Sequence, residues 1–124
     1  MKFYVASRFG KREETRSLMD AIESRGHEIT ADWTKHKPLE SYPDNAQISM
    51  EYAAEDLKGV RNCDAFIMVS DPEGTGIYIE LGAAIALGKK VFMIGPHTSH
   101  SVFFLLPQIK IVENLEEVFK ELNV

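Results

Sequence analysis

Apolar residues along this chain gather in short, strand-length runs separated by longer stretches with helical spacing. Four strong runs and one weaker run have the length of a strand: Phe3–Ala6, Asp64–Ser70, Lys90–Ile94, Ile109–Val112 and, more weakly, His27–Trp33. Around them, apolar residues recur every three or four positions in four segments: 13–25, 48–60, 76–88 and 114–122. We therefore predict strands and helices in the order β-α-β-α-β-α-β-loop-β-α.

This alternation predicts an α/β fold with a mostly parallel, five-stranded sheet. Parallel neighbours need a crossover between them, and right-handed crossovers place helices on both faces of the sheet. The chain has 124 residues, of which 44% are hydrophobic and 27% charged, which suits one core. We expect a single domain that spans residues 1–124.

Charge and cysteine content narrow the classes of partner. A net charge of −5 argues against broad binding to nucleic acid or to anionic membranes, because both need an excess of Lys and Arg. Cys63 is the only cysteine, which leaves no internal disulfide and no thiolate set for zinc. No window approaches the roughly 20 apolar residues of a membrane span. We expect a cytoplasmic protein with no nucleic-acid or membrane partner.

The sheet predicts where a ligand should bind. In open parallel sheets, ligands lie beyond the carboxyl ends of the strands, near the point where the strand order reverses. Four predicted loops reach that edge: residues 7–12, 32–45, 70–76 and 95–107. The first of them has neither a G-x-G-x-x-G fingerprint nor a Walker lysine, so the sequence does not support a dinucleotide or P-loop site.

One carboxylate stands out in GTGIYIELGAAIALG, the loop and helix that follow the apolar run Asp64–Ser70. Glu80 is the only charge between Gly76 and Gly88. Gly74 and Gly76 precede it in a turn where glycine lets a ligand approach the backbone. Glu80 could favour the helix dipole or face solvent, but a carboxylate held ionised near a helix N-terminus in apolar surroundings also suits a nucleophile.

Three other residues are candidates for a site at the same edge. Asp56 lies on the preceding helix and reaches the site only if that helix lies across the cleft, and an exposed Asp is the alternative. Arg8 follows the first strand in a cationic turn that could hold an anion, although solvated surface charge is the commoner explanation. Trp33 could stack on a base or belong to the core.

The run GIYIELGAAIALGKKV resembles the signature of the nucleoside 2-deoxyribosyltransferase family, which includes nucleotide N-glycoside hydrolases. The chain is also similar to that family at Phe3–Ser7 and at Glu55–Val60, which is followed by Cys63 and Asp64. The resemblance implies a doubly wound, flavodoxin-like fold. It also implies a homodimer or higher homo-oligomer in which partner residues complete the site.

The resemblance assigns roles to particular residues. Glu80 would be the nucleophile at C1′ of the sugar, Asp56 would bind and protonate the departing base, and Tyr4 would orient the nucleophile. Further residues would contact the substrate, either at the base, the sugar or a 5′-phosphate: Ser7, Arg8, Trp33, Gly74, Gly76, Ser99 and Ser101.

The implied reaction is a two-step retaining displacement on a small nucleoside or nucleotide. Glu80 expels the base, and a second base or water then takes the sugar, as in retaining glycosidases. The resemblance implies neither a metal nor a redox cofactor. The alternative from another class is a non-catalytic nucleotide-binding or signalling module that has the same pocket without turnover.

Overall fold

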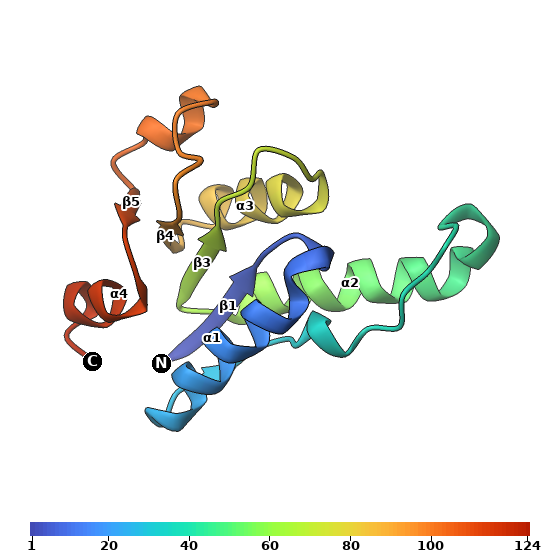
Figure 1. The fold of residues 1–124 in the computed structure, drawn as a ribbon, viewed down its shortest axis with the longest axis horizontal. Coiled ribbons are helices and arrows are strands. Elements are labelled where there is room, and N and C mark those ends of the chain that lie inside the picture. The colour runs from blue at the N-terminus through green and yellow to red at the C-terminus, as the bar shows by residue number, and fades with distance from the viewer.

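The protein is built on one parallel β-sheet. The computed structural model describes all 124 residues. It contains five strands: β1 Lys2–Ala6, β2 Glu28–Ile29, β3 Ala65–Val69, β4 Lys90–Ile94 and β5 Ile109–Val112. Every pair of neighbours is parallel, in the order β2-β1-β3-β4-β5 (Figure 1). The α/β fold predicted from the sequence is confirmed, and the sheet is entirely parallel.

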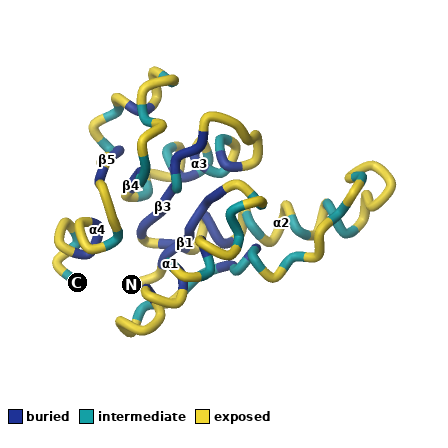
Figure 2. The backbone as a smooth tube through the Cα atoms, viewed as in Figure 1, coloured by how far each residue is buried: buried dark blue, intermediate teal, exposed yellow.

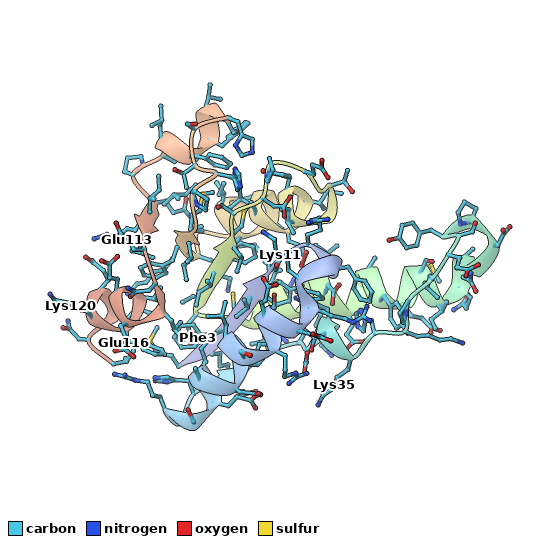
Figure 3. All side chains as sticks on the ribbon, viewed as in Figure 1. Phe3, Lys11, Lys35, Glu113, Glu116 and Lys120 are labelled. Carbon is cyan, nitrogen blue, oxygen red and sulfur yellow. The ribbon has the colours of Figure 1, made fainter.

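Three helices connect strands, a fourth follows β5, and together they cover both faces of the sheet. They are α1 Arg12–Ser24, α2 Ala46–Asn62, α3 Gly76–Ala86 and α4 Leu115–Leu122. The Phe3 ring, labelled in Figure 3, meets Phe119 of α4 edge-on at 6.3 Å between ring centres. Arg25 at the end of α1 lies over the same Phe119 ring. Tyr4, the next residue, points to the opposite face, where α2 and α3 pack together. Neighbouring β1 residues thus contact opposite helix layers, as strand pleating requires.

The core lies along β1 and β3. Residues from Phe3 to Ala6 and from Ala65 to Met68 are buried on both faces, which explains why these strands read as continuous apolar runs (Figure 2). Cys63 is buried beside them. None of the helices combines the length and the apolar character that crossing a bilayer requires.

The second strand is much shorter than the predicted run His27–Trp33. Its pairing with β1 covers only Glu28 and Ile29. At Asp32 the chain turns into a 3₁₀ segment, and the Asp32 carboxylate accepts a hydrogen bond from the backbone N–H of Thr34 at 3.1 Å. This local cap competes with strand pairing, as Asp side chains commonly do.

Helix α2 extends beyond the sheet. It has 17 residues, against five in β1, so it spans about 26 Å next to a strand of about 17 Å. Its N-terminal half and the preceding loop project from the body of the molecule in Figures 1 and 2, and most of that projection is exposed. This overhang forms a wall beyond the carboxyl edge of the sheet.

Candidate active site

The main cavity lies at the carboxyl ends of β1 and β3, where the strand order reverses. Its volume is about 440 Å³, which is within the usual range for small-molecule sites. It is lined by residues from three of the four predicted loops and from α2 and α3: Ser7, Arg8, Phe9, Trp33, His36, Lys37, Pro38, Leu39, Tyr42, Tyr52, Asp56, Gly74, Thr75, Gly76, Ile77 and Glu80.

Glu80 enters this cavity from the first turns of α3. The Tyr4 hydroxyl, which comes from β1, donates a hydrogen bond to Glu80 Oε2. Burial raises the pKa of Glu80 and the Tyr4 hydrogen bond lowers it, with a net value of about 7. Burial, followed by the charge of Glu80, raises the pKa of Tyr4, so the phenol keeps its proton and remains a donor. The structure thus holds Glu80 in one orientation by a neutral donor.

Gly59 of α2 allows this arrangement by its lack of a side chain. A Cβ at Gly59 would lie 2.5 Å from the Ala31 Cβ and 3.0 Å from Tyr4 Cδ2. Helix α2 can therefore approach the Tyr4 ring closely only with glycine here. The glycine of the Glu55–Val60 block consequently has a packing role directly behind the Tyr4–Glu80 pair.

We expect Gly59→Ala to lower the free energy of unfolding by about 1–3 kcal/mol, because overpacking outweighs the gain in helix propensity. Chemical denaturation measures this change. Gly82→Ala is the matched control, because it lies in α3 with no heavy atom within 4 Å of the added Cβ; it should be neutral or stabilising. Wild-type stability in Gly59→Ala would contradict the packing role.

Asp56 lines the same cavity from α2. The alternative prediction, a solvent-exposed Asp56, is wrong, because only 22% of this side chain is exposed. Burial, then the charge of Glu80, raises the pKa of Asp56, while His36 lowers it and Glu55 raises it, to a net value of about 7. Asp56 lies six residues before Asn62, the last residue of α2, about 9 Å along the helix, in the half of α2 that lies beside the sheet.

Two residues beside Asp56 were not singled out from the sequence. His36 stacks on Tyr52 with 3.9 Å between ring centres and 4° between planes. Its Nε2 lies 3.9 Å from Asp56 Oδ1 and 3.6 Å from Glu55 Oε2. Tyr52 precedes Asp56 by one helical turn, so the i, i+4 spacing could have identified it. For His36 the only signal was its place in one of the four loops.

Three buried side-chain atoms have no hydrogen-bond partner: Ser7 Oγ, His36 Nε2 and Asp56 Oδ1. All three residues line the one cavity. Buried polar atoms normally have partners, because leaving one unsatisfied costs free energy. Their clustering indicates a surface organised for a polar ligand.

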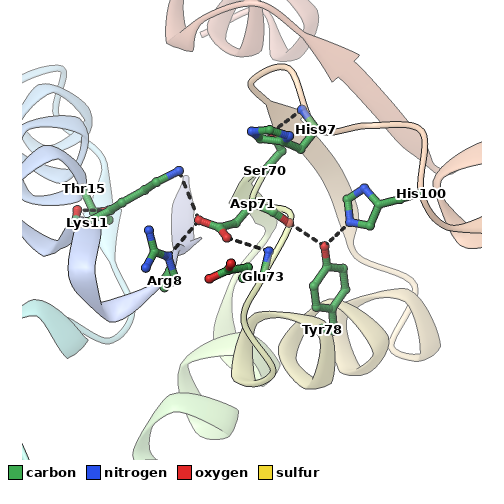
Figure 4. A network of polar contacts seen from close by, with 9 residues as sticks. All are labelled: Arg8, Lys11, Thr15, Ser70, Asp71, Glu73, Tyr78, His97 and His100. Carbon is green, nitrogen blue, oxygen red and sulfur yellow. Dashed lines mark hydrogen bonds and ion pairs between the residues drawn. The ribbon is translucent and has the colours of Figure 1, made fainter.

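Arg8 is held at the cavity by a network around Asp71 (Figure 4). Asp71 accepts from Arg8 Nε at 3.0 Å, from the backbone N–H of Glu73 at 2.8 Å, and pairs with Lys11 at 3.2 Å. Burial alone would raise the pKa of Asp71, but these donors lower it to about 2. One buried carboxylate thus meets two cations, and the cluster keeps an excess of positive charge.

The remaining predicted contacts divide into two groups. Trp33 is both a core residue and a cavity wall: it is 5% exposed, and its indole N–H donates to the Val5 carbonyl at 2.7 Å. Gly74, whose φ is +97°, and Gly76 also line the cavity.

Ser99 and Ser101 do not line the cavity. The Ser101 hydroxyl instead accepts from the backbone N–H of Phe103 at 3.3 Å and caps a 3₁₀ turn, Val102–Leu105. The Ser101 side chain therefore binds its own loop and does not line the cavity.

The arrangement combines two carboxyl groups and a tyrosine donor in one cavity. Tyr4 stabilises the ionised form of Glu80, whereas Asp56 Oδ1 has no donor. A proton shared by the two carboxyl groups is therefore favoured on Asp56, and Glu80 is favoured as the carboxylate. No group of three or more His, Cys, Asp or Glu side chains is placed to hold a metal ion.

Known proteins resemble this chain in sequence and in fold. The sequence profile of a family described as nucleoside 2-deoxyribosyltransferase matches residues 3–116. No curated protein sequence matches significantly. The structure of the CMP N-glycosidase BcmB from Clostridium botulinum is 20% identical, with a TM-score of 0.60 over 99% of this chain and 98% of that one. A 2-deoxyribosyltransferase from the psychrotolerant bacterium Bacillus psychrosaccharolyticus is 19% identical, with a TM-score of 0.68 over 95% and 90% of the two chains.

Proposed function

This chain belongs to the nucleoside 2-deoxyribosyltransferase family, and from that premise we propose that it breaks the N-glycosidic bond of a nucleoside or nucleotide through a covalent glycosyl-enzyme on Glu80. The observation that supports this most directly is the pair of carboxyl groups, Glu80 and Asp56, in one cavity with Tyr4 bonded to Glu80. The two groups have the complementary roles that a retaining displacement needs.

In the first step, a Glu80 oxygen bonds to C1′ of the sugar as the bond from C1′ to the base nitrogen breaks. The base leaves with the proton of Asp56, and Asp56 becomes a carboxylate. In the second step, water or the nitrogen of another base attacks C1′ and releases Glu80. Asp56 takes the proton that the acceptor loses, and the starting state is restored. Water as acceptor gives a hydrolase, and a second base gives a transferase.

The Arg8 cluster supports a substrate that carries a 5′-phosphate. Arg8 lines the cavity and, with Lys11, leaves one positive charge uncompensated by Asp71. Charge-assisted hydrogen bonds from a guanidinium suit phosphate oxygens. In this proposal Ser7 contacts the sugar or the phosphate, because its buried hydroxyl faces the cavity without a partner. Trp33, Gly74 and Gly76 complete the wall.

We further propose that two or more copies of the chain assemble around the site. Large apolar side chains are exposed on the outer faces of α2 and α3: Met50 is 59% exposed, Leu57 39% and Ile79 65%. These two helices also form walls of the cavity. A second copy that covers them would lie beside the substrate.

A substrate panel tests the proposed activity. The protein would be incubated with ribo- and deoxyribonucleosides and with their 5′-monophosphates, with and without a second free base, and the products separated by chromatography. We expect free base, or exchanged nucleoside when the second base is present, with a preference for 5′-monophosphates. If no substrate loses its base although nucleotides bind, the non-catalytic binding module is the better explanation.

A further inference from the structure

His36 faces two adjacent acidic residues of α2, Glu55 and Asp56, with a single nitrogen. Its Nε2 lies 3.6 Å from Glu55 Oε2 and 3.9 Å from Asp56 Oδ1. Neither distance is a hydrogen bond. One N–H can be directed well at only one of two acceptors, so the two carboxyl groups compete for the same donor.

Contacts with Tyr52 hold the His36 ring beside both carboxyl groups. It lies flat on the Tyr52 ring, and the Tyr52 hydroxyl accepts from the backbone N–H of Lys37 at 3.0 Å. The side chain of His36 is 11% exposed. The loop after the 3₁₀ turn at Trp33 is thus attached to α2 at His36 and at Lys37, which keeps the imidazole beside both carboxyl groups.

The two carboxyl groups differ in surroundings. Glu55 is 56% exposed and Asp56 22% exposed, so water solvates Glu55 at any stage of the reaction. Asp56 Oδ1 is buried without a partner. When Asp56 gives its proton to a departing base, a negative charge forms at this buried atom, and leaving such a charge without a donor is costly.

We propose that His36 is a positioning residue for Asp56: its Nε2–H is directed to Glu55 while Asp56 is protonated, and it turns to Asp56 once the proton has left. This inference rests on the proposed function, in which Asp56 is the acid. The change of partner breaks no covalent bond. It stabilises the Asp56 carboxylate until the acceptor of the second step returns a proton to it.

All titratable groups around Asp56 contribute to the expected pH dependence. Glu55 lies beside it on α2, Glu80 faces it from α3, Tyr4 from β1 and His36 from the preceding loop. Of these, His36 is the one that favours the ionised form of Asp56, whereas Glu55 and Glu80 favour the protonated form. Removing His36 or Glu55 should therefore shift the pKa of Asp56 in opposite directions.

The pH profile of kcat for base release tests this expectation. His36→Phe keeps an aromatic ring on Tyr52 and removes the donor. Its alkaline limb, which reports loss of the Asp56 proton, should move to higher pH by up to about one unit, because the Asp56 carboxylate loses the donor that favours its charged form. Glu55→Gln should move the same limb down, by less, because Glu55 is half exposed. His36→Gln, which can still donate, should recover part of the rate lost in His36→Phe.

Two outcomes would overturn the proposal. One is that both variants shift the alkaline limb in the same direction or not at all. The other is that His36→Gln is as slow as His36→Phe, which would indicate that the ring only packs. A variant that unfolds is replaced by His36→Asn, whose shorter amide tests the same donor.

A measurement without turnover separates this inference from the proposed activity. The chain has four histidines, so the ring signals of His36 can be assigned in NMR spectra by their loss in His36→Phe. We expect these signals to show a step caused by the ionisation of Asp56, which Asp56→Asn removes. If this step is present but no base is released, the coupling stands and the glycosidase proposal fails. If it is absent, the coupling fails whatever the activity.

Discussion

Glu80→Gln should reduce the rate of base release by about 10⁴-fold or more, as removal of a catalytic nucleophile does elsewhere. Glutamine keeps the size of the side chain and an oxygen that can accept from Tyr4, so the cavity should keep its shape. Nucleotide binding, measured by calorimetry, should change little. Loss of rate with retained binding separates a reacting carboxylate from one that only shapes the pocket.

Trapping the covalent intermediate tests the same role of Glu80 through a product that should appear. A substrate with an electron-withdrawing group at C2′ slows the second step, so the glycosyl ester should accumulate and add the mass of one sugar to the peptide that contains Glu80. Glu23→Gln, an exposed position on α1, is the matched control and should keep wild-type rate and labelling. A label on another peptide, or full activity in Glu80→Gln, would refute the assignment of the nucleophile.

Asp56→Asn has the second-largest expected effect, a loss of about 10²–10⁴-fold in kcat, the usual contribution of a general acid. The size of the loss should depend on the base. A base that leaves readily as an anion needs no proton, so the variant should approach the wild-type rate with such a substrate. Steady-state rates over a series of bases with different acidities measure this dependence.

The exposed Asp20 on α1, 64% exposed, offers the control for this series. Asp20→Asn should leave the dependence on the base unchanged. An Asp56→Asn rate that falls by the same factor for every base would mean that Asp56 holds the substrate and does not deliver a proton.

The sequence predicted the sheet and several of the residues that line the cavity, because both depend on local patterns. Buried parallel strands are continuous apolar runs, and the carboxyl edge of such a sheet follows from the order of the elements. Glu80, Gly74 and Gly76 all follow β3 directly, so their place at that edge needed no knowledge of packing. Family resemblance then added Tyr4, which the pattern alone presents only as a core residue.

What the sequence could not predict depends on contacts between distant segments. Asp56 reaches the cavity because α2 packs against α3 beside the sheet, a contact between segments that are separate in the sequence. The position of His36 depends on the path of an irregular loop, and such a loop has no hydrophobic periodicity from which a position can be predicted. Ser101 was expected to bind substrate because a serine in a loop at the right edge is chemically suitable, but its hydroxyl is used by its own turn.

The overhang of α2 divides the site into two mechanically distinct parts. Glu80, Tyr4 and the neighbourhood of Asp56 rest on the sheet, where the core fixes their positions. Tyr42 and Tyr52 line the cavity from the overhang and the loop attached to it. Under the proposed function, mutations in that projecting part would change which base fits, while Glu80, Tyr4 and Asp56 keep their positions. Substrate preference would then change without any change in the groups proposed to break the bond.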